Sequence, residues 1–243
     1  MNDAATPKQL EPADAAGFTQ RLAEVEARIA SAAAACGRDP GTVRLLGVSK
    51  TFGPEAVAAL HAAGLVRFGE NYLQESLDKV AALKGRAIEW HFIGPIQSNK
   101  TRPIAETFAW VHSVDRLKIA ERLSDQRPAG LPPLNVLLEI NVSGEASKGG
   151  ATPEELQQLA AAVAKLPNLK LRGLMAIPAP SADPVEQRAA FARVRAAFDA
   201  LNARGLGLDT LSMGMSGDLE AAIAEGATHV RVGSAIFGAR SYA

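Results

Sequence analysis

The chain has 243 residues, which is close to the roughly 250 typical of one (β/α)8 barrel and enough to bury a large core. Its 26 Lys and Arg residues balance 26 Asp and Glu residues, so we expect no binding to nucleic acid or to an anionic membrane surface. The single cysteine excludes an internal disulfide, and no apolar stretch approaches the roughly 20 residues that cross a bilayer. The composition therefore predicts a single-domain cytoplasmic protein.

The amino-terminal segment has no cationic start followed by an apolar core, so it does not read as a signal peptide. Residues 1–17 are rich in Pro and Ala, and we interpret them as a flexible lead-in to a domain spanning 18–243. An extra helix opens that domain, and we expect it to lie across one end of the fold. It is predicted from apolar residues at spacings of four, three and four, namely Phe18, Leu22, Val25 and Ile29.

Beyond this helix, short apolar runs alternate with segments that are rich in Ala and charge and have helical periodicity. The eight runs cover residues 42–49, 65–70, 88–94, 109–114, 135–142, 170–177, 209–214 and 229–233. Eight β-then-α units predict an α/β fold, a closed (β/α)8 TIM barrel. An open doubly wound sheet is the alternative. The absence of a Gly-x-Gly-x-x-Gly motif after the first run weakens its dinucleotide-binding form.

Polar residues gather where the runs end, which is the face of a barrel on which active sites are built. Lys50 follows the first run, Asn71 the second, and the segment 94–100 the third. Taken alone, Lys50 could be a solvated strand end, and Asn71 a helix cap or an ordinary loop residue. Because these residues are all expected at the same rim of the barrel, the pattern favours a binding site there.

The loops after the seventh and eighth runs, "MGMSGD" and "VGSAIFG", predict a phosphate site. Ser216 and Ser234 each lie beside a short helix, whose amino terminus would offer unpaired N–H groups; simple capping of those helices is the alternative. Arg231 lies inside the eighth run, where strand alternation can point it into the barrel. A guanidinium placed there needs an acceptor.

Closure of the barrel would make the first and eighth strands neighbours and bring Lys50 towards Arg231. Desolvation and a neighbouring cation favour the neutral amine of a lysine, the form that attacks a carbonyl. An aldehyde that carries a phosphate and a ring acceptor would use the amine of Lys50, the predicted phosphate site and the guanidinium of Arg231. Pyridoxal 5′-phosphate (PLP) has this chemistry.

Several long stretches resemble the pyridoxal phosphate homeostasis proteins, over about residues 18–240. Among them are "FGENYLQE", "EWHFIGPIQSNK", "VLLEINVSGEASKGG" and "LSMGMSGDLEAAIAEGATHVRVGSAIFG". The resemblance implies a barrel like the N-terminal domain of alanine racemase, with PLP held as a covalent aldimine (a Schiff base) on Lys50. It also implies that Arg231 contacts the ring nitrogen. The remaining pocket residues would be Asn71 and Met213, with Ser216, Gly233 and Ser234 at the phosphate.

Catalysis is not expected to be strong, and we assign no catalytic residue. Racemisation needs an acid or base on each face of the α-carbon, and the chain ends soon after the eighth run, with no second β-rich domain to bring an opposing tyrosine. Arg231 would keep the pyridine neutral and a weak electron sink. The sequence therefore predicts a monomer that buffers PLP and hands it to apo PLP-dependent enzymes, in vitamin B6 homeostasis and amino-acid balance. The alternatives are a weak racemase, with Lys50 as one base and Tyr72 or a residue from a partner chain as the other, or a regulatory protein-binding module.

Other reactive side chains carry weaker predictions. The four histidines show no i, i+4 pair, so no metal site is predicted, and His91 and His112 are expected to fill the barrel interior or its rim. Glu70 and Glu139 are interpreted as salt-bridge partners or, alternatively, as a buried acid pair. Lys148, in a Ser/Gly-rich loop, is a candidate second acceptor for the aldehyde.

Overall fold

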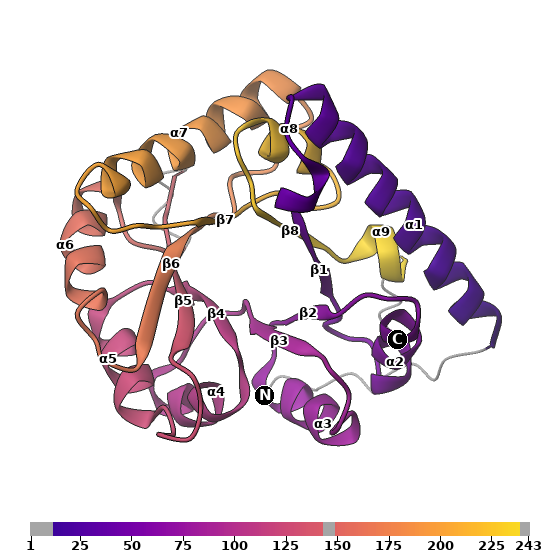
Figure 1. Ribbon diagram of the computed structural model, residues 1–243, viewed down its shortest axis with the longest axis horizontal. Coiled ribbons are helices and arrows are strands. Elements are labelled where there is room, and N and C mark those ends of the chain that lie inside the picture. Colours follow the sequence, from indigo (N-terminus) through magenta and orange to yellow (C-terminus); the bar gives the residue numbers. More distant parts are fainter. Residues whose placement is uncertain (1–11, 143–148, 239–243) are drawn as a thin grey trace.

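Eight parallel strands form a closed barrel in the computed structural model, which describes residues 12–142 and 149–238 (Figure 1). Each strand pairs with the next along the chain, and the last strand pairs with the first. The closed barrel confirms the predicted fold and excludes the open sheet. The strands coincide with the predicted apolar runs to within a few residues: β1 (Arg44–Val48), β2 (Arg67–Glu70), β3 (Glu89–Phe92), β4 (Trp110–Val114), β5 (Leu134–Glu139), β6 (Leu169–Met175), β7 (Thr210–Ser212) and β8 (His229–Val232).

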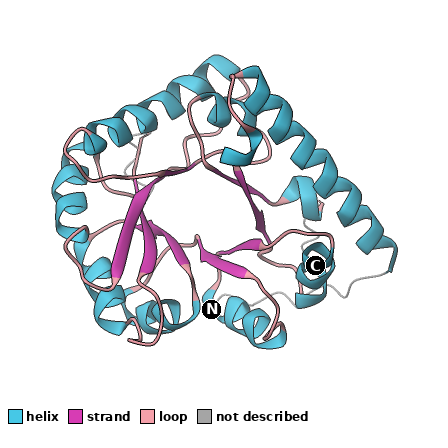
Figure 2. Cartoon of the chain, in the orientation of Figure 1, coloured by secondary structure: helices cyan, strands magenta, loops and turns pink. Residues whose placement is uncertain are grey.

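Helices surround the barrel on its outside, as Figure 2 shows. Proline occupies the first turn of several of them, where its missing N–H is no loss. They are α1 (Pro12–Ala35), α2 (Pro54–Ala62), α3 (Leu73–Ala82), α4 (Thr101–Thr107), α5 (Leu117–Gln126), α6 (Pro153–Val163), α7 (Pro184–Asn202), α8 (Leu219–Ala224) and α9 (Ser234–Phe237), with short 3-10 turns at Pro40–Thr42 and Ser98–Lys100. Among the described residues, no helix is long and apolar enough to cross a membrane.

Helix α1 is the extra helix, but its predicted place was wrong. It does not cross a barrel end; it lies in the outer ring and packs against α8, α2 and α9 (Figure 1). The reason is the length of α9, whose four residues cannot cover β8 and β1, so the buried face of α1 covers them instead. Helix α1 also begins at Pro12, so residues 12–17 of the predicted lead-in are helical, while residues 1–11 lie outside the described part of the chain.

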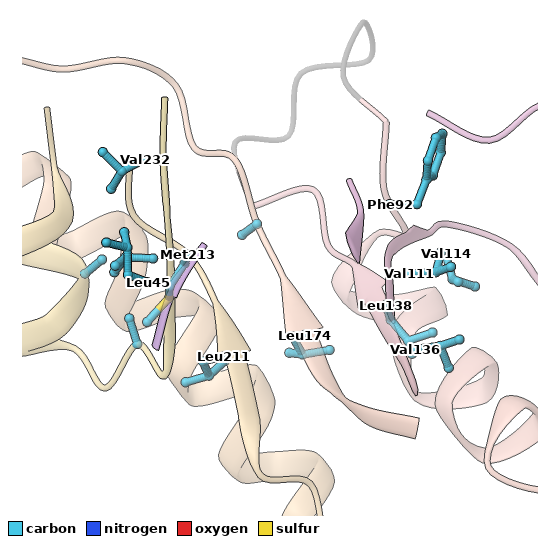
Figure 3. Close-up of a cluster of buried hydrophobic side chains, with 14 of the residues drawn as sticks. Leu45, Phe92, Val111, Val114, Val136, Leu138, Leu174, Leu211, Met213 and Val232 are labelled. Carbon is cyan, nitrogen blue, oxygen red and sulfur yellow. The ribbon is translucent and has the colours of Figure 1, made fainter. Parts of the chain in front are cut away.

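The pleat of the strands sorts side chains into two layers. Outward residues such as Leu45, Leu211 and Met213 pack in the hydrophobic cluster between the sheet and the helices (Figure 3). Inward residues include the apolar Leu46 and Val48, and also polar side chains such as His91 and His112. The barrel interior is thus only partly apolar, and its polar part leads to the candidate site.

We expect Gly173→Ala to destabilise the barrel by about 3 kcal/mol, because added atoms cannot be accommodated where two strands touch. A Cβ at Gly173 on β6 would lie 1.8 Å from the carbonyl oxygen of Thr210 on β7. Gly130→Ala is the control, since no atom lies within 4 Å of its Cβ position. Urea unfolding of both variants measures the difference; equal stabilities would contradict this account of the β6–β7 contact.

Candidate functional site

The carboxyl-terminal rim of the barrel brings the predicted site residues to one face. Lys50 lies two residues after β1, Asn71 directly follows β2, and Gly233 directly follows β8. Arg231 lies within β8 and is 4% exposed, so it is inside the barrel rather than on the rim. The predicted site residues therefore occupy two levels, an inner one and an outer one.

The pairing of β1 with β8 fixes the distance between those levels. Leu46 pairs with Arg231 and Gly47 with Val232, so Lys50 is four residues further along the chain than the partner of Arg231. At about 3.3 Å per residue, this offset corresponds to about 13 Å along the strand direction. The two cations come from neighbouring strands, as the sequence predicts, but they lie at different depths.

Lys50 itself is half-buried, and the backbone on both sides of it is held by one buried cluster. The ammonium of Lys79, on α3, donates to the carbonyl oxygen of Ser49 (2.7 Å), to Glu70 Oε1 (2.7 Å) and to Glu75 Oε1 (2.6 Å). The hydroxyl of Ser49 donates to Glu70 Oε1 (2.5 Å), and the amide N–H of Thr51 donates to Glu75 Oε1 (2.7 Å). These bonds fix the residues before and after Lys50.

The same cluster explains two unusual features near Lys50. Thr51 has a φ of 70°, a left-handed conformation that a threonine adopts only when its surroundings enforce it, and the bond to Glu75 does so. Burial raises the pKa of Glu70, and the neighbouring Lys79 opposes that rise. The salt bridge confirms the ion-pair interpretation of Glu70 over an acid pair.

Asn71 presents a buried side-chain oxygen to the site. Its Oδ1 has no hydrogen-bond partner among the residues that the structure describes. Its backbone is fixed by contact with Gly94, where a Cβ would lie 2.1 Å from the carbonyl oxygen of Asn71. A buried amide oxygen without a partner is costly in a finished structure, so a ligand donor here would be stabilising.

The two loops predicted to hold phosphate do meet. Ser234 Oγ donates to Ser216 Oγ (3.3 Å), which also accepts from the amide N–H of Ala235 (3.4 Å). Two arginines of α1 hold these loops from outside: Arg28 donates to the carbonyl oxygen of Ser216 (3.0 Å), and Arg21 to that of Ile236 (2.6 Å). The sequence analysis missed both arginines, although their spacing of seven places them on one helix face.

Met213 contributes to the site less directly than predicted. Its side chain is fully buried in the outer hydrophobic cluster with Leu211 (Figure 3), so only its backbone can face the pocket. Its amide N–H donates to the carbonyl oxygen of His229 (3.1 Å), which fixes the start of the loop that leads to Ser216.

Arg231 has the acceptors that its position requires. Its Nη1 donates to the carbonyl oxygen (2.7 Å) and the hydroxyl (2.8 Å) of Ser212, and its Nη2 to the carbonyl oxygen of Ala176 (2.9 Å). Burial lowers the pKa of Arg231 to about 10, so the guanidinium stays charged at neutral pH. These bonds use at most three of its five N–H groups, which leaves donor capacity for a further acceptor.

Three histidines meet inside the barrel, which the sequence analysis did not foresee because they come from different βα units. The ring centroids of His91 and His112 are 5.1 Å apart, and that of His229 lies 6.1 Å from His91. His91 and His112 fill the interior, as predicted. In the described ranges no group of three or more His, Cys, Asp or Glu side chains has the arrangement of a metal site.

The remaining candidates have plain positions. Cys36, the single cysteine, is exposed and follows the last residue of α1. Tyr72 is 54% exposed at the rim. Burial raises the pKa of Glu139. Lys148 lies outside the described residues, so its suggested role stays a prediction.

Comparison with known proteins identifies close relatives. Residues 21–241 match the family model of the alanine racemase N-terminal domain. A Pseudomonas aeruginosa protein named pyridoxal phosphate homeostasis protein is 68% identical over 225 residues, which cover 93% of this chain and 96% of that protein. The structure of PipY from Synechococcus elongatus with PLP bound is 34% identical, with a TM-score of 0.79, and covers 91% of this chain and 100% of that one.

Alanine racemase from Corynebacterium glutamicum has the same fold. It is 16% identical, with a TM-score of 0.71 over 93% of this chain and 62% of the racemase chain. At this identity the likeness concerns the fold alone.

We expect Lys79→Met to destabilise the protein by about 3 kcal/mol near pH 8, because it leaves the carboxylate of Glu70 buried without its cation. In this variant the pKa of folded Glu70 lies above its unfolded value, so the folded state holds an extra proton and stability falls as the pH rises. The loss relative to wild type should therefore be smaller at pH 5 than at pH 8, as measured by urea unfolding.

A double variant provides the control for this prediction. Glu70→Gln combined with Lys79→Met removes both charges of the buried pair, and it should recover much of the stability at pH 8. Wild-type stability of Lys79→Met at pH 8 would show that the cluster does not stabilise the fold.

Proposed function

The chain belongs to the pyridoxal phosphate homeostasis proteins, and we propose that it holds PLP at the barrel rim, bonded covalently to Lys50. The observation that carries this proposal is Arg231, a buried cation anchored as a donor beneath the rim. A group that reaches from Lys50 to Arg231 needs a reactive carbonyl at one end and a hydrogen-bond acceptor at the other. PLP has both, together with a phosphate.

The residues present fit each part of PLP. Lys50 offers a primary amine between two fixed backbone positions. The hydroxyls of Ser216 and Ser234, beside Gly233, lie where the phosphate would bind, and Asn71 offers its unpartnered buried oxygen to a donor. When bound, PLP supplies an aldehyde for amines and an electron-accepting pyridine ring. The pocket side chains supply only binding and orientation.

The role that we propose is reversible storage and transfer of PLP rather than strong catalysis. With a pKa of about 10, Arg231 would donate a hydrogen bond to a ring nitrogen and keep its own proton at neutral pH. A ring paired with such a donor would be a weak electron sink. The homeostasis name of the Pseudomonas aeruginosa relative supports this role.

A weak amino-acid racemase is the second candidate, favoured by the fold that the chain shares with alanine racemase. Tyr72 is exposed at the rim and is the candidate for a second base. We further propose that apo PLP-dependent enzymes receive the cofactor, and that the protein is a cytoplasmic monomer. Direct transfer to an apo-enzyme, faster than release into solution, tests the proposed acceptors.

Borohydride reduction of the PLP-loaded protein should leave the cofactor on Lys50, which is half-buried at the end of β1, because the neighbouring ammonium of Lys79 is buried and paired with Glu70 and Glu75. Reduction makes the carbon–nitrogen bond permanent, so peptide mass mapping locates it. An unreduced sample serves as the control, and an excess of inorganic phosphate should compete with loading. A label found mainly on another lysine of the wild-type chain would overturn the assignment.

The loaded protein should exchange α-protons of L- and D-amino acids with deuterated water no faster than free PLP does. The reason is that Arg231, a donor that keeps its proton, would leave the ring of PLP a weak electron sink. NMR of the amino acids measures the rate. Fast exchange that disappears in Lys50→Arg would instead support the racemase, and loss of that exchange in Tyr72→Phe would identify the second base.

A further inference from the structure

Four hydrogen bonds connect Arg231 to the opposite wall of the barrel. Ser212 Oγ on β7 accepts from Arg231 Nη1 (2.8 Å) and lies 2.9 Å from His112 Nδ1 on β4. His112 Nε2 lies 2.9 Å from His91 Nδ1 on β3, and His91 Nε2 lies 3.0 Å from Glu89 Oε1. Ser212, His112 and His91 have no exposed surface. The series crosses the interior and ends at the first residue of β3.

Glu89, the last group of the series, determines which group donates and which accepts in each of these hydrogen bonds. Glu89 is ionised: it forms a salt bridge with Arg67 (3.1 Å), and its pKa is lowered to about 2, mainly by the hydrogen bond with His91. A carboxylate only accepts, so His91 Nε2 must carry a proton. Burial lowers the pKa of His91, so its other nitrogen, Nδ1, is an acceptor in the neutral ring.

The same reasoning assigns the donors and acceptors of His112 and Ser212. His112 Nε2 donates to His91 Nδ1, and since burial lowers the pKa of His112 as well, His112 Nδ1 accepts. The hydroxyl proton of Ser212 then points at His112, and its lone pairs face Arg231. Each group donates to the next, from Arg231 to Glu89. The reverse direction would set two acceptors, His91 Nε2 and Glu89 Oε1, against each other.

This arrangement places a neutral acceptor beside the buried guanidinium and a carboxylate far from it. A carboxylate in the position of Ser212 would take two N–H groups of Arg231 and hold them. A hydroxyl takes one, and bonds that all point the same way strengthen one another. Arg231 is therefore oriented while donors remain for a ring nitrogen.

We propose that Ser212, His112 and His91 are positioning residues for Arg231 and, through it, for the pyridine ring of PLP. The identity of that ring rests on the proposed function. The two imidazoles are neutral and protonated on Nε2, and Ser212 is the residue through which they act. None of the three touches the cofactor in this proposal.

The ligand-free protein tests the hydrogen-bond direction by itself. With 15N-labelled histidine, long-range proton–nitrogen NMR at pH 7 should show His91 and His112 as neutral Nε2–H tautomers, with Ser212→Ala shifting the His112 signals. An imidazolium or an Nδ1–H tautomer at either residue would overturn the proposal. This measurement does not depend on PLP binding, so a failure of the proposed function is distinguishable from a failure of the series.

Binding measurements test the positioning role. Ser212→Ala should weaken PLP binding roughly tenfold, the effect expected when a charged donor loses one acceptor, and His112→Phe should do the same. The double variant should be no weaker than either single variant, because both break one series. Ser212→Thr keeps the hydroxyl and should bind PLP like the wild type.

His229→Phe is the matched control. His229 is buried, like His112, and its ring centroid lies 6.2 Å from that of His112, but its side chain takes no part in the series. It should leave PLP binding unchanged, with urea unfolding measured for every variant. Wild-type binding by Ser212→Ala, or an equal loss in His229→Phe, would overturn the positioning role.

Discussion

A guanidinium buried in a protein interior loses its hydration, which costs several kcal/mol unless protein acceptors replace the water. Arg231 is such a group, and the carboxyl-terminal half of the barrel is arranged around it. β7 supplies two oxygens through Ser212, and the chain directly after β6 supplies a third through Ala176. Arg231 and these acceptors come from three consecutive strands, so they are in place once β6, β7 and β8 have paired. The buried cation beneath the rim is thus a product of this pairing, and it fixes where the ring acceptor of the proposed cofactor would bind.

The last strand of the closed barrel needs a helix to cover it, and this explains the role of helix α1. The eighth βα unit ends in α9, which is too short to cover its strand, and α1 fills the gap from the other end of the sequence. In doing so it brings Arg21 and Arg28 against the loops that carry Ile236 and Ser216. The helix that completes the hydrophobic layer therefore also holds the loops proposed to bind phosphate. Stability of the barrel and geometry of the site depend on the same contacts.

The sequence predicted the barrel and the rim residues because both depend on local patterns: apolar runs of strand length, and polar residues where those runs end. It did not predict which inward residues meet across the barrel. His91, His112 and Ser212 lie in three separate units, and their contact depends on the stagger of the closed sheet, which no local pattern encodes. The place of α1 was missed for the same reason. The Lys79 cluster has a visible trace in the i, i+4 spacing of Glu75 and Lys79, but its link to Ser49 is tertiary.

Two buried polar clusters, around Lys79 and around Arg231, lie at different depths beside the proposed PLP site, and they hold different parts of the chain. The Lys79 cluster joins one ammonium to two carboxylates and grips the backbone on each side of Lys50, so it fixes the chain while Lys50 itself stays half-buried. The Arg231 series joins the guanidinium to the carboxylate of Glu89 through a serine and two histidines, and it fixes a side chain rather than the backbone. The structure thus combines a fixed donor inside the barrel with a half-buried lysine at the rim, the two features that the proposed attachment of PLP requires.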